Sequence, residues 1–285
     1  MTVVVPTVGR TDGVARCLDG IFAGSELPRE VVVVDQSGRE DVAQLLDQRA
    51  ALSVRLLHIA ADLRGLSSAR NVGARAASGD VFAFTDDDCV PDRDWIRALA
   101  GAFSVPDAPA AVTGPMLPLP GSAPGLVAVS SRTSLERREF VGRGRPWEIG
   151  TGGNVTLSRE WFDRVGGFDE RLGVGTPGRA GEDLDLFRRL LDAGGRIVYE
   201  PTAVCGHEQK TPGERRARRS SYGMGAGAAL GLWLRGGDLQ ALTSLARWVS
   251  LRVQMALRGS ALDELRVLGG TVRGVSYGLR LRPWR

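Results

Sequence analysis

The chain has 285 residues, of which 43% are hydrophobic and 25% charged, so it can bury a large core and is not intrinsically disordered. Its three cysteines, Cys17, Cys89 and Cys205, are widely spaced and include no Cys-x-x-Cys pair. This pattern argues against a disulfide framework and against a structural zinc site. Because such cysteines suit a reducing compartment, we expect a cytoplasmic protein.

The net charge of +4 is unevenly distributed along the chain. From Glu208 onward there are fourteen Lys or Arg residues against five Asp or Glu, whereas the preceding part is net acidic. This asymmetry predicts two parts with different partners, residues 1–209 and 210–285. The longest apolar run of the tail, residues 222–234, is shorter than the roughly 20 residues of a membrane span. An apolar strand begins at Thr2, so we expect no signal peptide.

Apolar runs alternate with helix-like segments through the first part of the chain. The sequence predicts strands at residues 2–5, 30–34, 54–59 and 81–85, and helices at residues 12–22, 41–52, 67–77 and 92–103. Strands that are apolar throughout indicate an α/β fold with parallel strands, and for the whole sheet we expect mixed strands. Ligands bind beyond the carboxyl ends of such strands, so we expect the loops after Val5, Val34 and Thr85 to share one crevice.

The elements that follow are less regular. Residues 107–125 are rich in proline and glycine, which predicts an irregular connection. A short helix is expected at residues 161–166, a longer one from residue 181 to 192, and a strand at residues 196–200. The basic segment from Lys210 onward is predicted to form a helical C-terminal appendage.

Three aspartates directly follow the strand predicted at residues 81–85. Asp86 and Asp88 are separated by one residue on a bend, so both can face a hard divalent cation. Phosphate oxygens of a ligand would complete the coordination shell of that cation. The alternative is structural, because Asp favours turns and helix N-caps and a helix is predicted to follow. Adjacent carboxylates repel one another unless a cation is present, which favours the metal site.

Six segments in a fixed order carry a resemblance to a known family. They read VVVPT, VVVVDQSG, LSSARNVGARAASGDVFAFTDDD, GTGGN, GGFDE and GEDLDLFRRLLDAGGRIVYEP. Together they make residues 2–207 resemble family 2 glycosyltransferases of the GT-A fold. The resemblance implies a three-layer α/β/α sandwich with a Rossmann-like nucleotide-binding half and an acceptor half. It also implies metal-dependent, inverting transfer of a sugar from a nucleotide diphosphate donor, with Mn²⁺ or Mg²⁺ as cofactor.

The resemblance assigns donor-binding residues as well. They are Pro6, Thr7, Arg10, Asp35, Gly65, Arg70, Asn71, Asp86 and Asp87, with Asp86 and Asp88 as the DxD pair that touches ribose and metal. Arg70 also has a physical argument, because a fixed cation beside a diphosphate forms charge-assisted hydrogen bonds. The alternative is a solvated arginine on a helix face, and Asp35 alone would be an ordinary turn residue. The family often has D-D-x-S or D-N-x-S where this chain has Asp35-Gln36-Ser37, which leaves uracil or thymine open as the base.

Glu182 and Asp183 are the candidates for acid–base chemistry. Inverting transfer is an in-line displacement, and a carboxylate opposite the diphosphate must accept the proton of the acceptor hydroxyl. The resemblance implies that Asp183 is this base and that Glu182 binds hydroxyl groups. The alternative is that both residues only complement the dipole of the helix that they begin. Four glycines within residues 173–181 suit a loop that closes over substrate and favour the catalytic interpretation.

The acceptor side is expected near Gly152, Gly153 and Asn154. Glycines let the backbone approach a sugar, and an amide both donates to and accepts from hydroxyl groups. An ordinary turn is the alternative. Trp147 could stack on a sugar face or belong to the core.

His207 follows a short segment where related enzymes often place a third metal ligand, so we expect the ligand set Asp86, Asp88 and His207. Neutral imidazole together with carboxylates suits Mn²⁺. His58 lies in the middle of a predicted strand, and we interpret it as structural.

The tail contains an arginine cluster and an amphipathic helix. Its apolar stripe consists of Leu242, Leu245, Val249, Val253 and Ala256, with Arg247 and Arg258 away from it. Two alternatives stay open. The stripe packs on the catalytic domain, or it lies on the inner face of an anionic membrane near a lipid-linked acceptor. No recognition motif accompanies the charge, so we expect no nucleic-acid partner.

The acceptor could be a glycan, a lipid-linked glycan or a small molecule. Two other functions predict different sequence signatures. A sugar nucleotidyltransferase would show a GxGxRL signature, but residues 5–10 read VPTVGR with one glycine. A non-catalytic GT-A-like binding protein would have lost the carboxylates, which are intact here.

Overall fold

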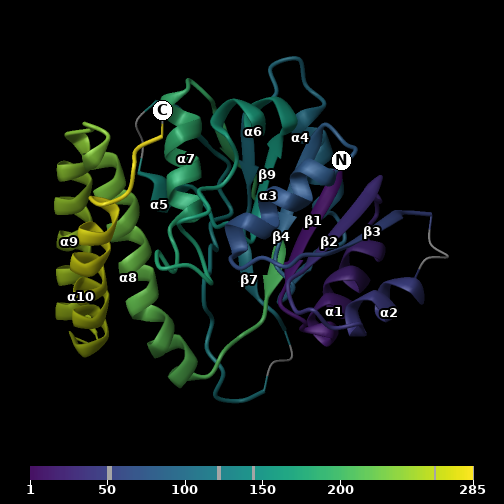
Figure 1. Cartoon of the computed structure of the whole chain (residues 1–285), viewed down its shortest axis with the longest axis horizontal. Coiled ribbons are helices and arrows are strands. Elements are labelled where there is room, and N and C mark those ends of the chain that lie inside the picture. The colour runs from purple at the N-terminus through teal and green to yellow at the C-terminus, as the bar shows by residue number, and fades with distance from the viewer. Residues whose placement is uncertain (50–52, 121–122, 143–144, 260, 285) are drawn as a thin grey trace. The chain divides into compact units, whose positions relative to one another are not determined.

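The structure is a computed structural model that describes residues 1–49, 53–120, 123–142, 145–259 and 261–284. Its larger sheet has eight strands in the order β3-β2-β1-β4-β9-β6-β10-β8. Strands β3, β2, β1 and β4 can be followed side by side in Figure 1. These strands are β1 (Thr2–Thr7), β2 (Glu30–Asp35), β3 (Arg55–Ala60), β4 (Val81–Thr85), β6 (Ala111–Thr113), β8 (Arg138–Phe140), β9 (Asn154–Ser158) and β10 (Ile197–Tyr199). A smaller sheet consists of β5 (Cys89–Pro91), β11 (Cys205–His207) and β7 (Met116–Pro118), in that order.

The larger sheet is mixed rather than purely parallel. Strands β3, β2, β1 and β4 run parallel to one another, whereas β9 is antiparallel to both β4 and β6. The carboxyl ends of the first four strands therefore meet at one edge, which is where ligands bind in such sheets.

Helices cover both faces of this sheet. The helices of the chain are α1 (Thr11–Phe22), α2 (Asp41–Asp47), α3 (Leu66–Ala76), α4 (Trp95–Phe103), α5 (Pro146–Ile149), α6 (Arg159–Val165), α7 (Glu182–Asp192), α8 (Pro212–Arg235), α9 (Gln240–Arg258) and α10 (Ala261–Gly278). On one face, α1, α2 and α4 form a core with alternate strand residues such as Val3 and Val31. On the other face, Gly73 of α3 lies against Val4, and the ring of Phe162 in α6 packs on that of Phe82 at 5.5 Å. The result is a three-layer arrangement.

The four strands and the helices predicted in the first part of the chain are confirmed, with ends shifted by a few residues. The helix predicted at residues 41–52 ends at Asp47, and residues 50–52 lie outside the described residues. The prediction of an irregular connection at residues 107–125 is wrong. Strand β6 of the larger sheet and strand β7 of the smaller sheet lie within it, and residues 121–122 lie outside the described residues. Strands of three residues need little local signal when neighbouring strands supply the hydrogen bonds.

The chain divides into two compact units. The first consists of Met1–Arg64, Ser68–Gly167 and Leu186–Gln209, and the second of Gly65–Ser67, Phe168–Asp185 and Lys210–Arg285. The sequence predicted a division between residues 209 and 210. That division places residues 65–67 and 168–185 in the part formed by residues 1–209. Packing groups these two segments with the C-terminal helices instead.

Within the second unit, α8 and α10 pack backbone against backbone. Each helix has a glycine at every fourth position of its contact face: Gly223, Gly227 and Gly231 on α8, and Gly270, Gly274 and Gly278 on α10. A Cβ atom added at Gly274 would lie 2.1 Å from the carbonyl oxygen of Met224. Small residues at this spacing let two helix axes come close together, and we call these six residues the glycine seam.

The stripe predicted on α9 coincides with its packed face only at Leu245, which packs against the cluster of Ala229, Leu230 and Trp233. Leu242 is 53% exposed and Val253 is 44% exposed, whereas Trp248 is buried. The indole Nε1 of Trp248 donates a hydrogen bond of 3.0 Å to Thr271 Oγ1 on α10. None of the described helices is both long and apolar enough to span a bilayer.

The glycine seam predicts opposite effects of one substitution at two positions of α10. Alanine normally stabilises a helix relative to glycine by about 1 kcal/mol, and at the open position Gly269 we expect such a gain. At Gly274 the added methyl group meets a backbone carbonyl, so we expect Gly274→Ala to lower the free energy of unfolding by about 3 kcal/mol. Urea denaturation of both variants measures the difference. Equal effects at the two positions would contradict this packing.

Candidate active site

The three aspartates after β4 have three different sets of partners. Asp87 is buried, and both of its carboxylate oxygens accept hydrogen bonds. Thr7 Oγ1 donates to it over 2.6 Å and Arg10 Nε over 3.0 Å, and a second guanidinium nitrogen of Arg10 forms an ion pair with it. Burial raises the pKa of Asp87 to about 6, although Arg10 beside it acts in the opposite direction. Asp87 thus fixes the loop after β1 to the loop after β4, a positioning role that differs from the predicted donor contact.

Asp88 faces His207. His207 Nε2 lies 3.6 Å from Asp88 Oδ1, and both side chains are at least nine-tenths buried. His207 Nδ1 lies 2.7 Å from the carbonyl oxygen of Glu208, which can only accept a hydrogen bond. Nδ1 therefore donates this hydrogen bond, and Nε2 is the ring nitrogen that faces Asp88. A second hydrogen bond that fixes the tautomer in this way is usual for metal-binding histidines.

A short antiparallel pairing holds these two groups together. In the pairing of β5 with β11, His207 lies opposite Cys89, the residue that follows Asp88. One ligand atom from each of Asp88, Cys89 and His207 lies within 4.8 Å of the others. A hydrogen bond with Cys205 and burial raise the pKa of the Cys89 thiol. A carboxylate and a neutral imidazole are donors that fit Mn²⁺.

Asp86 is bound to Arg70 and, among the described residues, is not part of this group. Arg70 NH2 donates to Asp86 Oδ1 over 2.7 Å, and the arginine side chain is 1% exposed. A Cβ atom at Gly152 would lie 2.7 Å from Arg70 NH1, and one at Gly153 would lie 2.9 Å from Asp86 Oδ2. The two glycines therefore leave room for the Arg70–Asp86 pair.

Asn154 has a role in the fold. Its side chain is 0% exposed and accepts from Trp95 Nε1 at 2.9 Å. Its amide nitrogen donates to the carbonyl oxygens of Pro115 and Ala203. Since these bonds occupy the amide, the prediction that Asn154 binds acceptor hydroxyl groups does not fit this geometry. Trp147 is half-buried on α5, and its carbonyl oxygen accepts a hydrogen bond from Arg132.

The remaining donor residues of the first unit lie at the ends of β1 and β2 and on α3. Pro6 is buried at the end of β1. Asp35 Oδ1 accepts from the backbone N–H of Ser37 at 2.9 Å, and Oδ2 lies 3.8 Å from Nε2 of His58 on β3. Asn71 is buried on α3. Gly65, with a φ of 113°, belongs to the second unit.

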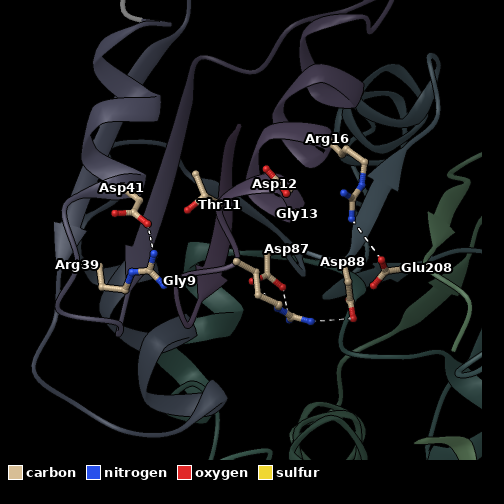
Figure 2. A pocket seen from close by; sticks show the side chains of 11 residues that line it. Gly9, Thr11, Asp12, Gly13, Arg16, Arg39, Asp41, Asp87, Asp88 and Glu208 are labelled. Carbon is tan, nitrogen blue, oxygen red and sulfur yellow. Dashed lines mark hydrogen bonds and ion pairs between the residues drawn. The ribbon is translucent and has the colours of Figure 1, made fainter. Parts of the chain in front are cut away.

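A cavity of about 510 Å³ opens beside Asp87 and Asp88 (Figure 2). Its cationic residues are Arg10, Arg16 and Arg39, and its acidic residues are Asp12, Asp41, Asp87, Asp88 and Glu208. Arg16 pairs with Glu208 at 3.3 Å, and Arg39 pairs with Asp41. Sequence reasoning missed Arg16 and Arg39. The position of Arg39 directly after the turn that ends β2 was the available signal.

Glu182 and Asp183 begin α7 and belong to the second unit. Glu182 is buried, and a Cβ atom at Gly173 would lie 3.4 Å from its carboxylate. Asp183 is half-buried, and its Oδ1 accepts a hydrogen bond of 2.8 Å from the backbone N–H of Leu184. The base role of Asp183 stays a prediction.

The sequence profile described as "Glycosyl transferase family 2" matches residues 2–166, more than half of the chain. The chain belongs to glycosyltransferase family 2. A second profile, "N-terminal domain of galactosyltransferase", matches residues 134–208 of this family member.

Curated relatives include a "Pre-mycofactocin glycosyltransferase" of Mycobacterium tuberculosis, which is 29% identical over 96% of this chain. The chain spans 62% of the length of that relative. A "Glucosyl-dolichyl phosphate glucuronosyltransferase" of Haloferax volcanii is 28% identical, over 73% of this glycosyltransferase and 69% of the relative.

Solved structures show the same fold. A mannosyltransferase of Pyrobaculum calidifontis in complex with GDP-Man and Mn²⁺ superposes with a TM-score of 0.60 at 20% identity, over 96% of this chain and 86% of the other. TarS of S. aureus in complex with UDP-GlcNAc gives a TM-score of 0.59 at 15% identity, over 97% and 88%. The predicted GT-A fold of this glycosyltransferase, with its C-terminal helices, is confirmed.

Proposed function

We propose that this family 2 glycosyltransferase transfers a sugar from a nucleoside diphosphate donor, a UDP- or dTDP-sugar, to an acceptor hydroxyl with inversion. The observation that carries the proposal is the buried pair formed by Asp88 and His207, whose Oδ1 and Nε2 atoms lie 3.6 Å apart while Nδ1 is fixed by the carbonyl oxygen of Glu208. Asp88 lines a cavity with three arginines, and a diphosphate needs cationic neighbours of this kind.

The charges around the cavity support a cation. Three arginines face five carboxylates, so the lining is short of two positive charges when all of them are ionised. One divalent ion restores the balance, and Asp88 and His207 would hold it. When bound, such an ion neutralises the charge that develops on the departing diphosphate.

The chain's own groups have separate tasks in this proposal. Arg10 and Arg70 are held by Asp87, Asp88 and Asp86, so both guanidinium groups are oriented before a donor arrives. Preorganised charges stabilise a transition state without the cost of reorienting solvent. Asp183 accepts the proton of the attacking acceptor hydroxyl, and Glu182 binds hydroxyl groups.

The proposal also names the chemical class of the acceptor. The Haloferax volcanii relative is named for a dolichyl phosphate acceptor, and on that similarity we favour a lipid-linked glycan over a free sugar. Cys17, Cys89 and Cys205 are buried free thiols, which suits the cytoplasm, and an acceptor of this kind would bring the enzyme to the inner face of the membrane.

Binding of nucleoside diphosphates tests the donor assignment. We expect isothermal titration calorimetry to show that UDP or dTDP binds in the presence of Mn²⁺ and binds at least about tenfold more weakly after chelation. UMP, which lacks the second phosphate, is the control and should show little dependence on Mn²⁺. GDP belongs in the same series. Metal-dependent binding of GDP in place of UDP and dTDP would overturn the base assignment, and no metal-dependent binding of any of the three would overturn the donor assignment.

A further inference from the structure

Helix α10 exposes a row of large apolar side chains along its length. Leu262 is 70% exposed, Leu265 is 61%, Val272 is 71% and Leu279, just past the last turn, is 44%. The first three and Gly269 follow the spacing of one helical face. The glycine seam uses the opposite face for packing on α8. This apolar row is therefore not required to hold the second unit together.

A row of arginines lies beside the apolar row. Arg266, Arg273 and Arg280 recur at seven-residue intervals, each directly after Leu265, Val272 or Leu279. Seven residues are almost two helical turns, so the three cations lie along one side of the apolar row. All three arginine residues are exposed.

The arginine row adjoins a second hollow. A cavity of about 480 Å³ is lined by Arg216, Ala217 and Ser220 of α8 and by Arg266 of α10. Arg273 NH2 donates to Ser220 Oγ over 2.9 Å, which connects the same two helices next to it. Two guanidinium groups and a hydroxyl group around a hollow of this size are suitable donors for a phosphate group.

Among candidate occupants, an anionic bilayer fits the charge and shape of this surface. Helix α10 has 18 residues and is about 27 Å long at 1.5 Å per residue, so it could lie flat at the boundary between acyl chains and headgroups. The apolar row would enter the acyl region, and the arginines would face lipid phosphates. A nucleic acid would meet the arginines but would leave the leucine row in water.

We propose that this face of the second unit docks on an anionic phospholipid membrane. Its contacts are Leu262, Leu265 and Val272 for the acyl chains, and Arg216, Arg266 and Arg280 for the phosphates. The proposal concerns the partner of the C-terminal helices and does not depend on the chemistry at Asp88 and His207. It also differs from the sequence-based expectation, which placed the membrane stripe on α9.

Vesicle flotation of the full chain tests the proposal. We expect wild-type protein to float with vesicles of phosphatidylglycerol and phosphatidylcholine in equal parts, and not with phosphatidylcholine alone. The charge variant Arg266→Gln/Arg280→Gln should bind the anionic vesicles about 30-fold more weakly, at roughly 1 kcal/mol for each arginine near an anionic surface. The apolar variant Leu265→Ser/Val272→Ser should bind at least about tenfold more weakly.

Control variants distinguish binding through this surface from nonspecific membrane binding and from the effects of misfolding. Arg97→Gln and Leu135→Ser alter exposed residues of the first unit and should float as wild type does. Metal-dependent nucleotide binding, measured in the same preparations, reports on the proposed activity separately and should be unchanged in every variant.

Three results would overturn the proposal. Wild-type protein could fail to float with anionic vesicles, or the first-unit variants could lose binding as strongly as the α10 variants. Light scattering could also show a dimer that the Leu265→Ser/Val272→Ser variant abolishes while vesicle binding persists. In that last case a second copy of the chain covers the row.

Discussion

Replacing Asp183 by asparagine is expected to lower the transfer rate by about 1,000-fold, because the acceptor hydroxyl then has no base to take its proton. Asparagine keeps the size of the side chain, and its oxygen can still accept the hydrogen bond that Asp183 Oδ1 accepts from the backbone of Leu184. The start of α7 should therefore stay folded. Binding of the nucleoside diphosphate and Mn²⁺, measured by calorimetry, should change less than about twofold.

A helix-dipole role for Asp183 makes a different prediction. In that case Asp183→Asn would cost about 1 kcal/mol of stability or less and would leave turnover as it was. The matched control is Asp163→Asn on the exposed side of α6, which should alter neither rate nor binding. Wild-type turnover by Asp183→Asn would remove the base assignment. A loss of donor binding equal to the loss of rate would indicate that Asp183 holds the donor.

Removing either proposed ligand of the cation should make the affinity for the donor nucleotide independent of the metal. We expect Asp88→Ala and His207→Ala each to weaken Mn²⁺ binding at least about 100-fold, since even the loss of a supporting contact to a ligand costs 10–100-fold. UDP or dTDP should then bind equally with and without Mn²⁺. Calorimetric titration of Mn²⁺ in the presence of the nucleotide measures this directly and needs no turnover.

Two further variants show which aspartates belong to the ligand set. Asp12→Asn alters the cavity wall on α1 outside the Asp88–Cys89–His207 group, so it should keep metal binding near the wild-type value. Asp86→Asn tests the sequence-based expectation that Asp86 is also a ligand. If Asp86→Asn loses as much Mn²⁺ affinity as Asp88→Ala does, Asp86 leaves its ion pair with Arg70 and binds the cation. If affinity is retained, Asp86 serves to orient Arg70.

The first half of the fold could be predicted from sequence because its strands are continuous apolar runs. A run such as 30–34 is buried on both faces and carries its own signal. Strands β6 and β7 are three residues long and take their conformation from neighbouring strands. The glycine seam was missed because glycine has a low helix propensity, so the local sequence does not favour a helix there. Its stabilising effect comes only from the close packing of a second helix.

The candidate site could be predicted in part, through the resemblance rather than through spacing. Asp88 and His207 were expected as ligands, and the structure places them face to face. The middle aspartate and Asn154 were expected to contact substrates, yet their polar atoms are used within the fold. A sequence shows that a polar residue is present but does not show whether a buried partner already occupies it. The assignment of Asp183 as the base stays a prediction, which the kinetic test addresses.

The pairing of β5 with β11 ties the proposed cation site to the very end of the first unit. Backbone hydrogen bonds between these three-residue strands set the distance from the Asp88 carboxylate to the His207 ring. A nascent chain that has emerged only as far as β10 would hold every strand of the larger sheet and still lack one of the two proposed ligands. Tight uptake of Mn²⁺ would consequently report that synthesis and folding have passed residue 207.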